Sequence, residues 1–218
     1  MSIAKRRAEE KTERRNAITD AAVIQFAEKG IDGTTYGDIA KQARLSRSLL
    51  YTYFDDANAL LLAVAERAEQ ALADAFEAAV AGEDRGLDQL LAIFHAYFAF
   101  LQDNPVYAEA LARAKQLTPT DAAQKANANL SCSTTGSATQ ITGEALATGI
   151  RDGSIRKDIP DPRQLGLALR GATLGFAILT EQMAEQLKEW GISPNHIAEI
   201  GQWLIREALE PKAGSDRP

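Results

Sequence analysis

Apolar side chains recur at the three- and four-residue spacing of an α-helix through almost the whole sequence, which limits the fold classes open to the chain. Ile18, Ala22 and Phe26 show this spacing near the N-terminus. The sequence has no convincing run of alternating apolar and polar residues, which a half-buried β-strand would need. With 45% hydrophobic and 25% charged residues, a chain of 218 residues can bury a substantial core. We therefore expect an all-α protein.

Start and stop signals divide the N-terminal region into short helices. A first helix is expected over residues 9–28. Thr35 and Asp38 have the spacing of a capping box that opens a second helix. Ser46 is placed to cap a third helix over residues 47–54. Two short helices joined by a tight turn predict a helix-turn-helix.

Signals of the same kind predict the later helices, over residues 58–80, 87–104, 106–117, 141–150, 162–190 and 194–205. Thr118 to Asp121 form a further start signal. Residues 131–137 are rich in hydroxyl side chains and fit a loop or a packed helix equally well. The tail over residues 211–218 is expected to be disordered.

Charge is distributed unevenly along the chain. Residues 1–54 hold ten Lys and Arg against seven Asp and Glu, a balance of +3, although the whole chain has a formal net charge of -6. A basic N-terminal part on an acidic body indicates a nucleic-acid contact confined to one end. The cations of residues 5–15 fit either a solvated tail or a contact in a DNA groove.

Several classes of protein are disfavoured by the composition. Cys132 has no second cysteine to pair with, and with His95 and His196 it supplies too few ligands for a typical zinc site. The sequence has no triad pattern and no phosphate-binding loop, so we expect no enzyme, no metal and no cofactor. It shows no signal peptide and no apolar run long enough to span a bilayer, so we expect a cytoplasmic protein without a membrane partner.

Small, apolar and aromatic positions follow one register through the short N-terminal helices: Thr34, Thr35, Asp38, Ile39, Ala40, Leu45, Ser46, residues 50–54, Leu60 and Leu61. In this pattern the chain resembles the N-terminal DNA-binding domain of the TetR family of bacterial transcriptional regulators. Residues 149–153 also look like that family's link between its last long helices. The resemblance implies a helix-turn-helix domain over residues 1–56 and a helical effector-binding and dimerisation domain over residues 57–210.

The third helix is expected to be the recognition helix that enters the major groove of DNA. Leu50 and Phe54 would face the core with Ile39 and Leu45. The outward side chains would then contact bases, the residues after them would contact the DNA backbone, and the start of the second helix would add phosphate contacts. The expected DNA-binding residues are Thr35, Tyr36, Arg47, Ser48, Leu49, Tyr51, Thr52 and Tyr53.

The chain departs from the family pattern at two positions. Arg44 occupies the turn position where the family usually has glycine, so a left-handed backbone there would cost about 1 kcal/mol. Ala57 replaces a lysine that is frequent at the start of the fourth helix. The loss of one phosphate contact would reduce the salt slope of DNA binding by about one unit.

The resemblance implies a small-molecule effector site in the larger domain. An aromatic and apolar cluster with a few polar side chains is the expected lining: Phe94, His95, Tyr97, Phe98, Leu101, Tyr107, Leu111, Phe176, Leu179, Thr180 and Met183. Packing of these residues in an ordinary core is the simpler interpretation for each of them taken alone.

Small residues on the last two long helices favour close helix approach and a homodimer: Gly166, Gly171, Ala172 and Gly175, opposite Ile197, Ile200, Gly201 and Leu204. We therefore expect a homodimeric repressor that binds palindromic double-stranded operator DNA and is released by a small apolar effector. The alternative is a helical ligand carrier or protein-binding module that has lost specific DNA recognition.

Overall fold

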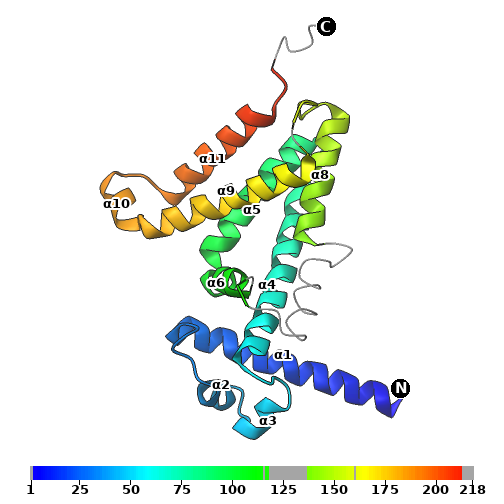
Figure 1. Cartoon of the computed structure of the whole chain (residues 1–218), viewed down its shortest axis with the longest axis vertical. Helices are drawn as coiled ribbons and strands as arrows, with labels where there is room; N and C mark the ends of the chain where they lie inside the picture. Colours follow the sequence, from blue (N-terminus) through cyan, green and yellow to red (C-terminus); the bar gives the residue numbers. More distant parts are fainter. Residues whose placement is uncertain (1, 115, 118–136, 160, 213–218) are drawn as a thin grey trace. The chain divides into compact units, whose positions relative to one another are not determined.

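The computed structural model describes residues 2–114, 116–117, 137–159 and 161–212, and all regular secondary structure among them is helical (Figure 1). This confirms the all-α expectation. Within these residues, no helix combines the length and the apolar character needed to cross a lipid bilayer. The expectations for Thr118 to Asp121 and for residues 131–137, apart from Ser137, lie outside the described residues, as does most of the tail.

The chain forms two compact units. The first comprises Met1–Glu69 with Asn104–Cys132, and the second comprises Gln70–Asp103 with Ser133–Pro218. The border at residue 56 that the sequence suggested therefore falls inside the first unit. Helix α4 (Ala57–Val80) begins in the first unit and ends in the second.

The first unit contains α1 (Ile3–Lys29), α2 (Tyr36–Gln42), α3 (Arg47–Tyr51), the first part of α4, and α6 (Pro105–Ala114). Its core includes fully buried side chains from four of these helices and from the turn after α3: Ile18, Ile39, Leu50, Phe54, Leu60 and Val64. The inward orientation expected for Ile39, Leu50 and Phe54 is confirmed, whereas Leu45 is only half-buried.

Helix α3 is shorter than expected, because it ends at Tyr51 and not at Phe54. The amides of Thr52 and Tyr53 bond to the carbonyls of Leu49 and Leu50 at 3.1 and 3.0 Å, three residues back. This tighter spacing ends the α-helix. Phe54 is still buried, so the turn continues the inward face of α3.

In the part of the second unit that the structure describes, the rest of α4 is followed by α5 (Gly86–Asp103), α8 (Ala138–Asp152), α9 (Pro162–Gln182), α10 (Ala184–Glu189) and α11 (Pro194–Leu209). Several helix boundaries in both units differ from the sequence expectation. The cap formed by Ser2 starts α1 at Ile3, the cap formed by Ser137 starts α8 at Ala138, and α6 ends at Ala114.

The single helix expected over residues 162–190 is interrupted at Met183. Helix α9 ends at Gln182, Met183 leaves helical geometry with φ -102° and ψ 16°, and α10 follows as a separate short helix. The break lets α10 bury Leu187 while Trp190 after it stays exposed. No proline or glycine marks the break in the sequence, so tertiary packing decides it.

The segment after α8 caps the start of α5. The Gly86 amide donates to Asp152 Oδ2 at 2.8 Å, and the Leu87 amide donates to Ser154 Oγ at 3.0 Å. Hydrogen bonds from Ser154 and from the Gly86 amide hold the pKa of Asp152 below its usual value. The two helices meet backbone to backbone here, because a Cβ atom on Gly86 would lie 1.9 Å from the amide nitrogen of Gly149.

Gly86→Ala is expected to lower the free energy of unfolding by about 3 kcal/mol, because α5 and α8 must move apart to accept the methyl group. Chemical denaturation of the whole chain measures the effect. Gly143→Ala is the matched control, since a Cβ atom there meets nothing within 4 Å. The control should stabilise α8 by about 0.5–1 kcal/mol. Equal effects of the two substitutions would contradict the backbone contact.

Candidate nucleic-acid interface

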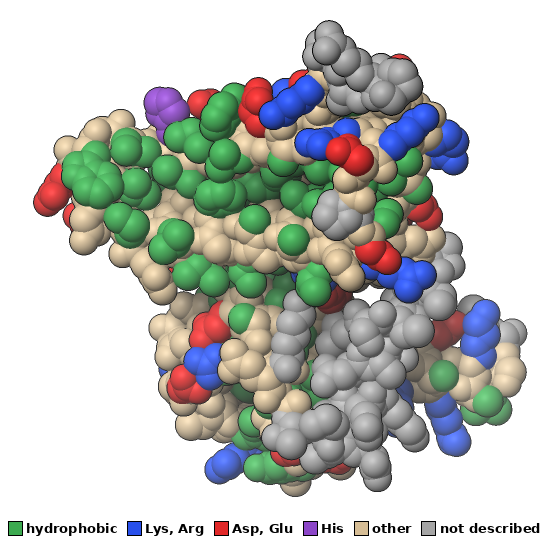
Figure 2. Space-filling view, turned by 45° about the horizontal axis from the view of Figure 1, so that its top comes forward, with side chains coloured by type: hydrophobic (Ala, Val, Ile, Leu, Met, Phe, Trp, Pro, Cys, Tyr) green, Lys and Arg blue, Asp and Glu red, His purple; other side chains and the backbone are tan. Residues whose placement is uncertain are grey.

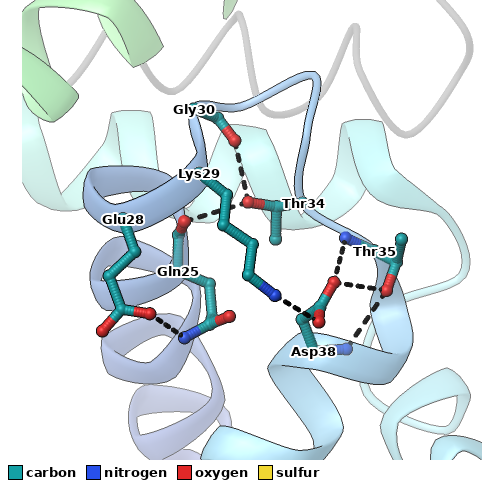
Figure 3. A network of polar contacts seen from close by, with 7 residues as sticks. All are labelled: Gln25, Glu28, Lys29, Gly30, Thr34, Thr35 and Asp38. Atoms are coloured by element: carbon teal, nitrogen blue, oxygen red, sulfur yellow. Dashed lines mark hydrogen bonds and ion pairs between the residues drawn. The ribbon is translucent and has the colours of Figure 1, made fainter.

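The start of α2 is fixed by the capping box that the sequence predicts. The Asp38 amide donates to Thr35 Oγ1 at 3.2 Å, and the Thr35 amide donates to Asp38 Oδ2 at 3.0 Å. Lys29 at the end of α1 donates to the other carboxylate oxygen of Asp38 at 2.5 Å (Figure 3). The same carboxylate therefore caps α2 and joins it to α1. The hydrogen bonds from Lys29 and Thr35 hold the pKa of Asp38 well below its ordinary value.

The connection from α1 to α2 is closed by Thr34. Its Oγ1 lies 3.0 Å from the Gln25 carbonyl oxygen and 2.8 Å from that of Gly30, to which it can donate (Figure 3). Gly30 has φ 75°, a conformation that favours glycine. These contacts satisfy carbonyls at the end of α1 and set the direction in which α2 begins.

Arg44 shapes the turn between α2 and α3. Its φ is 56°, the left-handed region, and among the described residues no other residue except glycine has a positive φ. The Leu45 amide donates to the Ala40 carbonyl at 2.8 Å, and the Arg44 amide donates to that of Lys41 at 3.1 Å. This is the Schellman pattern, with arginine at the position that glycine usually fills. The strain expected at Arg44 from the sequence is therefore present.

Helix α3 begins at the cap formed by Ser46, whose Oγ accepts from the Leu49 amide at 3.2 Å, as the sequence predicts. The side chains of Arg47, Ser48, Tyr51 and Thr52 are exposed, and those of Leu49 and Tyr53 are half-buried. A Cβ atom on Gly37 would lie 3.9 Å from Arg47 Cδ, so the stem of Arg47 runs beside the start of α2.

Tyr51 lies on a buried aromatic platform. Its ring stacks on that of Tyr36 with centroids 4.8 Å apart and an interplanar angle of 26°. Tyr51 is 48% exposed and Tyr36 only 9%. The Tyr36 hydroxyl donates inward to the Phe54 carbonyl at 3.4 Å, and burial raises the pKa of this hydroxyl. Tyr36 is therefore placed to support Tyr51, and its hydroxyl does not face outward toward a phosphate.

A groove with basic walls runs between α1 and the end of α3. Its lining consists of Arg7, Glu10, Lys11, Arg14, Leu49, Thr52 and Tyr53. Arg15 fixes the two elements together, since its Nη1 donates to the Tyr53 carbonyl at 3.2 Å and its guanidinium lies 4.2 Å from the Phe54 ring centroid. Residues 5–15 are thus helical and some of them lie beside α3, which the sequence left open.

The second unit contains a cavity of about 520 Å³. Phe94 and Tyr97 are the only residues of the expected effector set among the described residues that line it. The other predicted residues lie elsewhere: Tyr107 and Leu111 in the first unit, Phe98, Leu101 and Thr180 buried, Phe176 and Met183 half-buried, and His95 and Leu179 exposed.

The sequence pattern missed most of the cavity lining. Leu72 and Phe76 come from the end of α4, Leu146 from α8, and Arg163 and Arg170 from α9. Phe76 packs edge-on against Tyr97 at a centroid distance of 6.0 Å. The aromatic cluster in the sequence indicated that α5 lines the cavity. Which helix faces border the cavity depends on how α8 and α9 are placed, and residue spacing does not give that placement.

Apolar side chains are exposed over the last helices of the second unit. Figure 2 shows hydrophobic side chains gathered on one face of the molecule, and the exposed large ones on α9 and α11 are Leu167, Ile178, Leu179, Ile200, Trp203 and Leu204. The expectation that Gly201 faces a partner is wrong, because Gly201 is buried and its Cβ would lie 2.4 Å from Phe94 Cζ. Gly171 and Gly175 have open space where a Cβ would be.

Arg44→Gly is expected to raise the free energy of unfolding by about 1 kcal/mol, because glycine adopts the left-handed conformation without a Cβ clash. Arg44→Ala is the matched control, since alanine keeps the Cβ atom and should give no such gain. Urea denaturation of the three proteins distinguishes them. Equal stability of the Gly and Ala variants would show that the turn is not strained.

Asp38→Asn is expected to destabilise the protein in a pH-dependent way. The pKa of Asp38 is lower in the folded protein, so its ionised form adds stability above its ordinary pKa of 3.8, and this contribution is lost as the pH falls through the folded value. The stability difference between the original protein and the variant should therefore be largest near neutral pH and shrink below about pH 4. Denaturation from pH 7 to pH 2 measures it, with Glu77→Gln, an exposed site on α4, as the control. A stability difference between the two proteins that stays constant with pH would show that the ionised form of Asp38 does not stabilise the fold.

Residues of the first unit are similar to those of known regulatory proteins. The model of the family described as "Bacterial regulatory proteins, tetR family" matches residues 18–64, which cover most of α1, all of α2 and α3, and the start of α4. IcaR of Staphylococcus aureus, a negative transcriptional regulator of the biofilm operon icaADBC, is 46% identical over 41 residues. That match covers 19% of this chain and 22% of IcaR, so the chain spans about a fifth of the length of this relative.

Solved structures share the fold over nearly the whole chain. A protein of unknown function from Rhodococcus sp. RHA1 has a TM-score of 0.72 at 20% identity, with 91% of this chain and 95% of the other covered. The fatty acid degradation regulator FadR of Bacillus halodurans has a TM-score of 0.64 at 20% identity, with 94% and 97% covered. Residues 18–64 therefore match the tetR family of bacterial regulatory proteins, and the chain shares its helical fold with these solved structures.

Proposed function

We propose that this chain is a transcriptional repressor that binds a palindromic operator as a homodimer and is released from it by a small apolar effector. The observation that carries the proposal is the outward face of α3, where Arg47 and Tyr51 are exposed and Tyr51 stacks on the platform of Tyr36. Repression is supported by IcaR, a negative regulator that is similar over 41 residues.

Base recognition is assigned to the exposed side of α3. The guanidinium of Arg47 can donate two hydrogen bonds to the O6 and N7 atoms of guanine, and Ser48 is exposed beside it. Leu49 or Tyr51 can contact the methyl group of thymine. Because the stack on Tyr36 already restricts the Tyr51 ring, ordering this side chain on DNA costs less conformational entropy.

Phosphate contacts are assigned to the end of α3 and to the basic groove beside it. Thr52 and Tyr53 border the groove together with Arg7, Lys11 and Arg14. The Thr52 hydroxyl donates to the Leu49 carbonyl at 2.6 Å, so it must rotate before it donates to a phosphate. Thr35 is engaged in its capping box. The cations of α1 are therefore the main phosphate contacts, and they offset the missing lysine at Ala57.

The exposed apolar face of α9 and α11 is the proposed dimer interface. Trp203 is 57% and Leu179 is 54% exposed, and large apolar side chains gathered on one face favour burial against a partner. Gly171 and Gly175 permit close helix approach. A C2 dimer would present two α3 helices about 34–36 Å apart to successive major grooves, which requires a palindromic operator. Sedimentation as a monomer at micromolar concentration would count against the dimer.

The cavity of the second unit is the proposed effector site. Its volume of about 520 Å³ lies within the roughly 300–1,000 Å³ typical of small-molecule sites. Most of its lining is apolar, as expected for an apolar effector. An effector that binds the DNA-free conformation better than the DNA-bound one would release the operator.

Selection of bound fragments from a random DNA pool by the purified protein is expected to give a palindromic consensus. Arg47→Ala should weaken binding to that consensus by about tenfold or more and relax the preference at one base pair, because a bidentate base contact is lost. Tyr51→Ala should also weaken the consensus. Arg14→Ala should instead weaken all sequences alike and reduce the salt slope by about one unit.

Arg151→Ala is the control, because Arg151 is an exposed cation on α8 in the second unit. It should leave the consensus and the affinity unchanged. Binding that is salt-sensitive but shows no preferred sequence, or no DNA binding at all, would refute the proposal and favour a helical carrier or protein-binding module.

A further inference from the structure

The inner wall of the cavity in the second unit is apolar. Leu72, Phe76, Leu90, Phe94 and Leu146 line it and are buried. Each buried methylene group of a ligand in such surroundings adds about 0.8 kcal/mol of favourable transfer free energy. The inner part of the cavity therefore fits a hydrocarbon group.

Two hydroxyl groups that line the cavity already make hydrogen bonds within the protein and need none from a ligand. Thr142 donates to the Ala138 carbonyl at 2.8 Å, and Thr173 donates to that of Leu169 at 2.9 Å. Among the described residues, no buried side-chain nitrogen or oxygen lacks a hydrogen-bond partner. A hydrocarbon can thus occupy the inner cavity without leaving a side-chain polar group unsatisfied.

The outer part of the cavity is exposed to solvent and has charged side chains in its lining. Thr139 and Gly143 of α8 and Arg163 and Leu167 of α9 line the cavity and are exposed, so it opens to solvent between these two helices. Arg163 and the half-buried Arg170 lie two turns apart on α9. Among the described residues that line the cavity, these two arginines carry the only formal charges. Both lining charges are thus positive although the chain as a whole carries a net charge of -6.

We infer that the ligand of this cavity is an amphipathic anion, with its hydrocarbon part against the inner wall and a carboxylate at Arg163 and Arg170. Guanidinium groups bind carboxylates through charge-assisted and often bidentate hydrogen bonds. An amphipathic cation would be repelled by the same two groups. The inference rests on the proposed function in that it names the chemical class of the effector.

Calorimetric titration of the full chain, without DNA, tests the inference with three probes of equal chain length: dodecanoate, dodecanol and dodecyltrimethylammonium. The two ionic probes are used below their micelle-forming concentrations, and dodecanol is used below its solubility limit. Dodecanoate should bind at least about tenfold more tightly than either of the others, because it alone pairs a negative charge with the two guanidinium groups. Arg163→Gln combined with Arg170→Gln should remove this preference and leave the binding of dodecanol unchanged.

Two further variants locate the binding. Arg151→Gln removes an exposed arginine of α8 that does not line the cavity, and it should keep the preference for dodecanoate. Gly143→Trp places a large side chain at the opening, where a Cβ atom meets nothing within 4 Å, so the fold should tolerate it. This variant should weaken dodecanoate at least about tenfold, since the indole occupies space that the probe needs.

Tighter binding of dodecanol or of the cationic probe, binding of none of the probes, or a preference for dodecanoate that survives the double Gln variant would overturn the inference. None of these results would affect the selection of an operator from random DNA, which tests the proposed function separately. A chain that binds dodecanoate through the two arginines but selects no DNA sequence would retain this site and lose the repressor assignment.

Discussion

The proposed DNA interface depends on the burial of Leu50. Helix α3 has five residues, and Leu50 is its only fully buried one. Isolated helices shorter than about 12–15 residues are marginal in water, so α3 exists because tertiary structure holds it. The Schellman turn at Arg44 fixes its start, and Arg15 holds the chain just after it through the Tyr53 carbonyl and the Phe54 ring. The arrangement of Arg47 and Tyr51 on the outer face is therefore set by contacts on the inner face.

Interactions between residues close in the sequence explain why the helix caps and the turn of the first unit could be predicted. A cap joins residues that lie within three positions of one another, so the roles of Thr35, Asp38 and Ser46 follow from spacing alone. The left-handed conformation of Arg44 was predictable for the same reason, because a left-handed residue must follow α2 for the turn to close. The inward position of the Tyr36 hydroxyl was not predictable, since it depends on the Phe54 carbonyl eighteen residues away.

Long-range packing explains what the sequence did not predict in the second unit. Whether an aromatic side chain borders a cavity or fills the core depends on helix rotation, which spacing does not fix. Phe94 both lines the cavity and packs edge-on against Phe176, at a centroid distance of 6.2 Å. Gly201 makes room for its ring, which explains a small residue that otherwise suggested an interface between subunits. The match to a known family came from the first unit, where local spacing carries most of the pattern.

The charge distribution affects how such a protein would discriminate among DNA sequences. Residues 1–54 carry a balance of +3, and the remaining residues must carry -9 to give the total of -6. Contacts with phosphate supply affinity for any sequence, whereas base contacts supply the difference between sequences. An acidic remainder would limit general attraction to DNA, so the cations of residues 1–54, three of which line the groove beside α3, would add affinity mainly when α3 is oriented toward the duplex. Under these conditions the few base contacts proposed for α3 would make up a larger share of the binding free energy, which favours specificity over tight nonspecific binding.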